Sequence, residues 1–239
     1  MYHGGMDTSV VIPMHNEVEA LPDLLKALRS FWQSNESHMA MEFLLIDDGS
    51  TDGTFDLAWR EADHFPAPMK VLRLKPQEGL GGALRAGFSF ATGDVVVTYD
   101  ADLPYPLADL PRLVRAIHDG ADIATASPYH PEGEVEGVSA LRLIPSRLVS
   151  WLYRLRFIGY PRLYTYTCGF RAYRREILDS IEPTANGFLA TSQLLCRGLR
   201  AKLKVHEIPS RLRQRVTGQS KMRVLRTAFT HLLYLIRAR

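Results

Sequence analysis

Two carboxylates one residue apart, Asp100 and Asp102, directly follow the apolar run VVVTY at residues 95–99. Burying two such groups together is costly unless a cation offsets their repulsion. A hard divalent cation takes oxygen ligands, and it can bridge to diphosphate oxygens with few ligands from the protein. Such a metal stabilises the charge that develops on a departing diphosphate. The Asp100-Ala101-Asp102 turn therefore predicts a metal and diphosphate site, with a solvated turn as the alternative.

Polar residues also end two earlier apolar runs, TSVVIP at 8–13 and EFLLI at 42–46. Asp, Gly and Ser favour helix caps and turns, which is the alternative reading of Asp47-Asp48-Gly49-Ser50 taken alone. Ligands of open parallel sheets bind beyond the carboxyl ends of the strands, so we expect the three ends to converge on one crevice. The polar and turn residues at the two earlier ends are Pro13, His15, Asn16, Glu17, Asp47, Asp48 and Ser50.

The elements that must position these residues alternate along the first half of the chain. Continuous apolar strands that alternate with amphipathic helices predict an α/β fold with a mostly parallel sheet. We expect strands at 8–13, 42–46, 69–74, 94–99 and 122–126, and helices at 18–32, 52–62, 79–91 and 109–119.

The alternation weakens after Ser127. There is no internal repeat and no low-complexity linker, so a single domain over 1–239 is expected. The remaining expected elements are a long apolar segment with arginines at 139–158, strands at 168–173 and 204–208, and helices at 186–198 and 222–236.

A glycine-rich turn, Gly79-Leu80-Gly81-Gly82, precedes one of the expected helices. It does not match a dinucleotide-binding fingerprint, because the place of the third glycine is taken by Leu84. Its glycines are better explained by close backbone approach to a ligand or by tight helix packing.

The chain has 239 residues, of which 46% are hydrophobic and 23% charged, with a formal net charge of +3. The charge is too small to indicate nucleic acid, and we expect no nucleic-acid partner. From Arg197 to Arg239, however, Glu207 is the only carboxylate among many basic residues. By itself, this asymmetry favours an anionic partner, which can be a phosphate, a lipid headgroup or nucleic acid.

The two cysteines, Cys168 and Cys196, have neither metal-ligand spacing nor a disulfide pattern, which is typical of a reducing, cytosolic setting. The N-terminal segment MYHGGMDTSVVIP lacks the pattern of a signal peptide. No run of roughly 18 apolar residues occurs, so any membrane contact is expected to be peripheral.

The whole pattern resembles glycosyltransferase family 2 of the GT-A fold, and within it the polyprenyl-phosphate (dolichyl-phosphate) mannosyl- and glucosyl-transferases. The resemblance implies a Rossmann-like, mostly parallel sheet flanked by helices, with a C-terminal acceptor-side elaboration and amphipathic helices. Residues 1–127 would form the nucleotide-sugar-binding half of one GT-A domain, and 128–239 the acceptor and membrane half. The resemblance runs through VVIPMHNE, LLIDDGSTDGT, EGLGGALRAGF, GDVVVTYDADLPYP, CGFRAYRREIL and GQSKM.

The same resemblance implies an inverting transfer of a mannose- or glucose-type sugar from a GDP- or UDP-linked donor to a polyprenyl phosphate, with Mg²⁺ or Mn²⁺. Asp100 and Asp102 would bind the metal and, with Arg215, form the catalytic set. Arg171, Arg215, Ser220 and Lys221 would contact the acceptor and phosphates, with a solvated basic loop as the alternative for Arg215 and Lys221. The implied nucleotide-binding residues are Pro13, His15, Glu17, Asp47, Asp48, Ser50, Gly79, Asp100 and Ala101.

A lipid phosphate is already an anionic nucleophile, so positioning and charge stabilisation can do most of the work. Two other functions stay open: transfer to a hydroxyl or amine, which would need a general base, and nucleotide-sugar binding with little turnover. A nucleotidyltransferase is less favoured, because no glycine-rich loop with a basic residue follows the first strand. Departures from the family pattern, which bear on the acceptor more than on the reaction class, occur at Pro104, Pro128, Thr165 and Gln193.

The segments 139–158 and 222–236 both combine basic residues with Trp, Tyr, Phe or Leu. Such helices can lie in the interface of an anionic membrane. Core or dimer packing is the alternative, and the oligomeric state stays open. We therefore expect a cytoplasmic protein that contacts the cytoplasmic face of a membrane peripherally.

Overall fold

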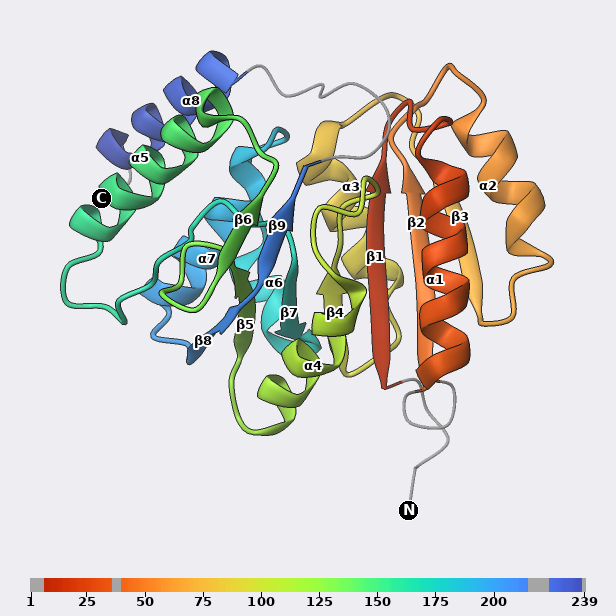
Figure 1. The fold of residues 1–239 in the computed structure, drawn as a ribbon, viewed down its shortest axis with the longest axis horizontal. Helices are drawn as coiled ribbons and strands as arrows, with labels where there is room; N and C mark the ends of the chain where they lie inside the picture. The colour runs from red at the N-terminus through yellow and green to blue at the C-terminus, as the bar shows by residue number, and fades with distance from the viewer. Residues whose placement is uncertain (1–6, 36–39, 215–223, 238–239) are drawn as a thin grey trace.

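The structure is a computed structural model that describes residues 7–35, 40–214 and 224–237. Its centre is a seven-stranded sheet with the order β3-β2-β1-β4-β7-β5-β8, and helices cover the sheet (Figure 1). Neighbouring strands are parallel except for β7, which pairs antiparallel with both β4 and β5. The predicted α/β fold with a mostly parallel sheet is confirmed. The strands are β1 (Thr8–Met14), β2 (Met41–Asp47), β3 (Met69–Arg73), β4 (Val95–Thr98), β5 (Ile123–Ser127), β7 (Arg171–Arg174) and β8 (Val205–Pro209).

The helices follow the expected segments with shifts of a few residues at their ends. Three elements were not predicted: α6 and the strands β6 (Glu134–Glu136) and β9 (Arg211–Arg213), which pair parallel as a separate two-stranded sheet. These strands are three residues long and carry charged residues at both ends, so they offer no apolar run to recognise. The helices are α1 (Leu21–Asn35), α2 (Thr54–Ala62), α3 (Gly79–Phe90), α4 (Leu110–His118), α5 (Ala140–Arg156), α6 (Leu178–Ile181), α7 (Leu189–Arg200) and α8 (Val224–Arg237), with 3₁₀ turns at 107–109 and 175–177.

The central strands are apolar throughout because both faces of the sheet are covered. Successive side chains of a strand point to opposite faces. In β1, Val10 and Ile12 therefore belong to one core and Val11 to the other, and none of the three is exposed. Every residue of β2 is buried for the same reason.

The sheet order brings the three polar strand ends together, as predicted. β1 lies between β2 and β4, so the loops after these strands share one edge of the sheet. β7 then runs antiparallel beside β4, with Arg171 opposite Thr98. Its direction places the chain just before β7 next to the turn that follows β4.

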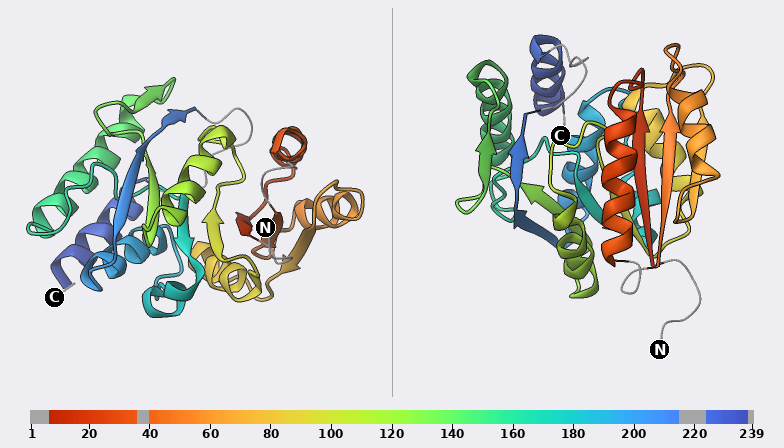
Figure 2. Two further views of the ribbon diagram at one scale, coloured as in Figure 1. Left: turned by 90° about the horizontal axis from the view of Figure 1, so that it is seen from below. Right: turned by 45° about the vertical axis from the view of Figure 1, so that its right-hand side comes forward.

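The helices α5 and α8 lie side by side at the end of the molecule away from α1 and α2 (Figure 1), and the further views keep them together (Figure 2). A hydrogen bond between Tyr153 of α5 and His231 of α8 links them. None of the helices in the described ranges has the length and apolar character needed to cross a bilayer.

Candidate active site

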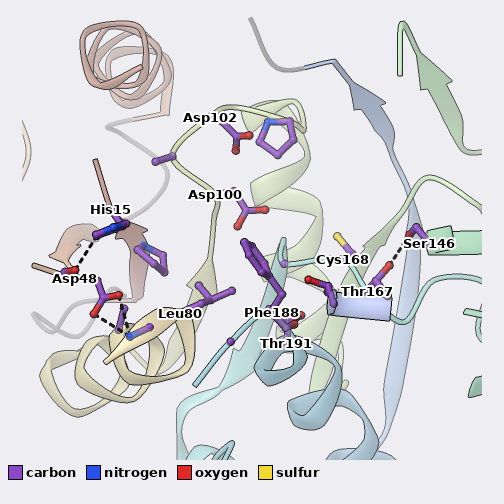
Figure 3. Close-up of a pocket in the computed structure, with 18 of the residues that line it drawn as sticks. His15, Asp48, Leu80, Asp100, Asp102, Ser146, Thr167, Cys168, Phe188 and Thr191 are labelled. Atoms are coloured by element: carbon purple, nitrogen blue, oxygen red, sulfur yellow. Dashed lines mark hydrogen bonds between the residues drawn. The ribbon is translucent and has the colours of Figure 1, made fainter. Parts of the chain in front are cut away.

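A cleft of about 630 Å³ opens at the carboxyl ends of β1, β2 and β4. His15 and Asp48 lie at one end, Asp100 and Asp102 in the middle, and Ser146 with Thr167 at the other end (Figure 3). The cleft thus joins the predicted strand-end residues to the second half of the chain.

The loop after β1 is held in shape by the loop after β2. The backbone N–H of Asn16 donates to Ser50 Oγ at 2.8 Å, and that of Glu17 donates to Thr54 Oγ1 at 2.8 Å. Asn16 itself has φ of 52°, a left-handed conformation that asparagine tolerates better than most residues. These bonds hold the loop that presents Pro13, His15 and Glu17 on the cleft wall.

Two residues expected at the nucleotide lie behind this wall, which corrects their predicted role. Asp47 has no exposed surface, accepts a hydrogen bond from the Ser50 N–H at 3.2 Å, and pairs with Arg73 Nε at 3.3 Å. Ser50 is buried as well and uses its hydroxyl for Asn16. Both support the loops and do not line the cleft, because their side chains are buried and engaged with neighbouring loop residues.

Asp48 is both a helix cap and a cleft residue, the two interpretations that the sequence left open. Its Oδ1 accepts from the Glu78 N–H at 2.7 Å and its Oδ2 from the Gly79 N–H at 2.9 Å, which caps the first turn of α3. It also lines the cleft, and its carbonyl accepts from His15 Nδ1 at 2.9 Å. The cap fixes the His15 and Asp48 end of the cleft relative to α3.

The glycine-rich turn is explained mainly by tight packing. A Cβ on Gly81 would lie 1.9 Å from the carbonyl oxygen of Ala185, and one on Gly79 would lie 2.3 Å from that of Asn186. Gly79 also has φ of +76° and lines the cleft. Only glycine allows this approach between α3 and the segment before α7.

The Asp100 carboxylate rests against the backbone of Gly169. A Cβ built on Gly169 would lie 3.0 Å from both carboxylate oxygens of Asp100, so the absence of a side chain there makes room for the acid. Ala101 and Asp102 also line the cleft.

The donor set suits a hard divalent cation, because both side chains offer carboxylate oxygens. Over the ranges that the structure describes, no third His, Cys, Asp or Glu completes a metal-binding group. Pro104 lines the cleft as well, and its carbonyl accepts from the Arg213 N–H at 2.8 Å, which ties the turn to β9.

Arg171, expected at the acceptor phosphate, is a buried structural residue, and that prediction is wrong. Its side chain has no exposed surface. The guanidinium donates to Thr125 Oγ1 at 2.9 Å, to the Tyr166 carbonyl at 2.8 Å and to the Thr191 carbonyl. Because β7 runs between β4 and β5, this side chain enters the core instead of the cleft.

The three other residues expected at phosphates, Arg215, Ser220 and Lys221, lie outside the described residues. Two of the departures from the family pattern are buried and satisfied. Thr165 Oγ1 bonds with Ser127 Oγ at 2.7 Å, and Gln193 Oε1 accepts from the Thr184 and Ala185 N–H groups at 3.0 and 2.8 Å.

The far wall of the cleft was not predicted. It is formed by α5, α8, the segment before β7 and the start of α7, and Ser146 Oγ bonds with Thr167 Oγ1 at 2.9 Å across it (Figure 3). The segment CGFRAY matched the family pattern and so could have indicated Cys168 and Gly169. The residues on α5 and α8 could not be found in this way, because the sequence of a helix does not reveal which of its faces lines a cleft. The residues missed on this wall are Pro145, Ser146, Val149, Thr167, Cys168, Gly169, Phe188, Thr191, Thr227, Ala228 and His231.

Comparisons with known proteins identify relatives of this chain. The model of the family described as glycosyl transferase family 2 matches residues 9–182. The chain is 32% identical to a dolichol-phosphate mannosyltransferase of Pyrococcus furiosus over 97% of its own length and 63% of that protein's. It is 34% identical to a polyprenol monophosphomannose synthase of Mycolicibacterium smegmatis over 90% of its own length and 80% of that protein's.

Solved structures share the fold. A glucosyl-3-phosphoglycerate synthase of Mycobacterium tuberculosis, crystallised with Mn²⁺, UDP and glucosyl-3-phosphoglycerate, superposes with a TM-score of 0.68 at 20% identity. The match covers 98% of this chain and 79% of that one.

Proposed function

The chain belongs to glycosyl transferase family 2, and from that premise we propose that it transfers a sugar from a nucleotide diphosphate to a polyprenyl phosphate. The observation that carries the proposal is the place of Asp100 and Asp102, midway along one cleft that has a polar strand-end wall on one side and two helices on the other. Two relatives that match most of this chain are named for transfer of mannose to such lipids.

The donor nucleotide is proposed to lie at the strand-end wall. Pro13, His15, Glu17 and Asp48 line this end and are held by the hydrogen bonds described above. Carboxylate and imidazole side chains there suit the hydroxyls of a ribose and the edge of a base. Whether guanine or uracil is preferred is part of the experiment below.

Asp100 and Asp102 are the proposed ligands of Mg²⁺ or Mn²⁺. When bound, such an ion offsets the negative charge that grows on the leaving nucleoside diphosphate. The protein would contribute by presenting both carboxylates at the end of β4, with Asp100 held against Gly169. The remaining coordination positions are left to diphosphate oxygens and water.

An acceptor phosphate can attack the anomeric carbon without a general base, because it is already anionic. Entry from the end opposite the nucleotide would place the nucleophile on the far side of the breaking bond, which gives inversion. Positioning of the two reactants in one cleft is then the main catalytic contribution. Since Arg171 is buried, the phosphate contacts are proposed for Arg215, Ser220 and Lys221.

The outer face of α5 supports a peripheral membrane contact. Its exposed large apolar residues recur every three or four positions, which makes one continuous row on the side away from the core. Leu141 in the first turn of α5 and Ile158, just beyond the last residue of α5, are 84% and 77% exposed. The row is Leu141, Ile144, Leu148, Trp151, Leu155 and Ile158, and the neighbouring α8 adds Phe229, Leu232 and Ile236.

Arginines flank this apolar surface. Arg147 lies over the Tyr129 ring and Arg154 over the Tyr164 ring, at 5.3 and 4.9 Å. An apolar row flanked by positive charge suits an anionic lipid surface. The free, buried cysteines Cys168 and Cys196 are compatible with the cytoplasmic face.

The test is an incubation of the protein with GDP- or UDP-linked mannose or glucose, Mg²⁺ or Mn²⁺, and a polyprenyl phosphate, followed by measurement of nucleoside diphosphate release. Release that needs the lipid phosphate is the expected result. Release that needs a hydroxyl or amine acceptor instead would overturn the proposed acceptor, and donor binding without any release would indicate a binding protein.

A further inference from the structure

His231 of α8 lies on the far wall of the cleft, beside Val149 of α5 and Ala228 of α8. It is 3% exposed, which is unusual for an imidazole that also faces a cleft. Among the residues that line the cleft in the described ranges there is no lysine or arginine. A neutral hydrogen-bond donor on this wall would therefore add to the phosphate contacts proposed for Arg215, Ser220 and Lys221.

The orientation of the His231 ring is fixed from the core side. Its Nδ1 is 2.9 Å from the hydroxyl of Tyr153, and the two rings meet edge to face with centroids 5.8 Å apart. Tyr153 in turn stacks on Tyr166 at 5.2 Å and is not exposed. Because Nδ1 bonds toward the core, Nε2 is the ring nitrogen available to the cleft. Nε2 is not one of the described polar atoms that are both buried and without a hydrogen-bond partner.

The surroundings keep this imidazole neutral. Burial lowers the pKa of His231 to about 4. Tyr153 of α5 contacts the ring, and burial raises the pKa of that hydroxyl, so it stays protonated beside the imidazole. If the Tyr153 hydroxyl donates to Nδ1, the neutral ring carries its proton on Nε2 and points an N–H into the cleft.

We infer that His231 binds the acceptor, with Nε2–H donating a hydrogen bond to an oxygen of the polyprenyl phosphate. This inference rests on the proposed function. The cleft end opposite His15 and Asp48 lies between α5 and α8, the two helices whose outer faces carry the apolar rows, so a lipid-linked phosphate enters past His231. The bond orients the nucleophile and removes no proton.

Three substitutions separate binding from a purely structural role. His231→Phe keeps an aromatic ring but removes both nitrogens. His231→Gln carries an amide N–H near the position of Nε2, and His231→Asn carries one near Nδ1, toward Tyr153. The assay uses a short-chain, water-soluble polyprenyl phosphate, so that membrane binding does not enter.

With His231→Phe, the acceptor KM is expected to rise roughly 10- to 100-fold, the range for a hydrogen bond to a charged group. The donor KM and the kcat at saturating acceptor should change by less than about threefold. His231→Gln should recover most of the acceptor affinity, and His231→Asn should not. Thermal unfolding of each variant checks that the helices remain packed.

An unchanged acceptor KM in His231→Phe would overturn the inference. So would equal recovery by Asn and Gln, or a parallel rise in the donor KM, because each points to packing of α8 alone. A wild-type protein that transfers nothing to polyprenyl phosphate refutes the proposed function and this inference with it, and that result is visible before any variant is made.

Discussion

The donor end of the cleft is built from loops that hydrogen-bond to one another, whereas the far end is built from two helices, of which α5 packs aromatic rings on the rest of the protein. At the donor end, Asp48 caps α3 and the Asn16 loop is tied to Ser50. At the far end, Tyr153 stacks on Tyr166 and packs against Phe157. Hydrogen bonds between loops hold the one end, and aromatic packing together with the Tyr153–His231 hydrogen bond holds the other.

This difference assigns separate tasks to the two ends. A nucleotide diphosphate requires fixed polar partners at defined positions, which backbone-anchored loops supply. A lipid-linked acceptor requires an apolar approach and few charged contacts, which paired helices with outward apolar rows supply. On the proposed function, we therefore expect the reaction class to depend on the donor end and acceptor choice to depend on α5 and α8.

The largest loss of activity is expected from a substitution in the middle of the cleft, between the two ends. Asp102→Ala should lower kcat/KM by on the order of 100- to 1000-fold, because it removes a carboxylate from the proposed metal site. Metal-dependent donor binding, measured by calorimetry with and without Mn²⁺, should be lost. Asp56→Ala, on the exposed surface of α2, is the control. Donor affinity that stays unchanged in Asp102→Ala would refute the metal assignment.

Gly169→Ala should act on the same site without removing a functional group. The added Cβ would lie 3.0 Å from both Asp100 carboxylate oxygens, so the acid must shift by a few tenths of an ångström. We expect kcat to fall roughly 10- to 100-fold, as for a small misplacement of a reacting group, while the unfolding temperature changes little. Gly187 also lines the cleft, and Gly187→Ala adds the same methyl group to the cleft wall where it meets no protein atom within 4 Å. If both variants lose activity equally, contact with Asp100 is not the cause.

The outer face of α5 offers a prediction that concerns only the acceptor end. Trp151→Ser should weaken binding to anionic vesicles by about tenfold, because a large apolar side chain no longer enters the interface. Turnover of a short, soluble acceptor should persist. Trp59→Ser is a matched control, since Trp59 is 55% exposed and Trp151 51%. If the wild-type protein does not bind these vesicles at low salt, the membrane contact is contradicted. If Trp151→Ser changes only the oligomer mass, the surface instead pairs copies of the chain.

The smallest effect on activity is expected for Glu42, which supports the donor half from the opposite edge of the sheet. Burial alone would raise its pKa, but hydrogen bonds from Thr92, Lys70 and Ser9 outweigh this and lower the pKa from 4.5 to about 2. A lowered pKa in the folded state stabilises the protein above the unfolded value, and this stabilisation is lost as the pH falls from about 4.5 toward 2.

Glu42→Gln should therefore lower the free energy of unfolding by about 2–3 kcal/mol at pH 7, with kcat unchanged below the unfolding temperature. The difference between the two proteins should shrink in denaturant titrations as the pH is lowered from 4.5. A difference that stays constant down to pH 3 would mean that the carboxylate charge is not the stabilising feature.

Much of the donor half was predictable because its signals are local. Apolar runs mark β1, β2 and β4, and the polar residues that follow them mark the edge where a parallel sheet binds ligands. Asp100, Asp102, His15, Glu17 and Asp48, which the sequence placed at strand ends, all line the cleft, and their roles remain predictions. The errors at Asp47 and Ser50 arose because neighbouring residues of a turn point in different directions. The sequence does not specify the direction of each side chain.

The amino-acid sequence by itself determined the α/β alternation, the family and the acidic turn, because each depends on residues that are close along the chain. Only the tertiary structure decided which side chains meet across the cleft. The antiparallel insertion of β7 sends Arg171 into the core and Gly169 against Asp100, and the packing of α5 on α8 turns His231 toward the cleft. These outcomes depend on contacts between residues far apart in sequence, and such contacts form only when the whole sheet and its helices are in place.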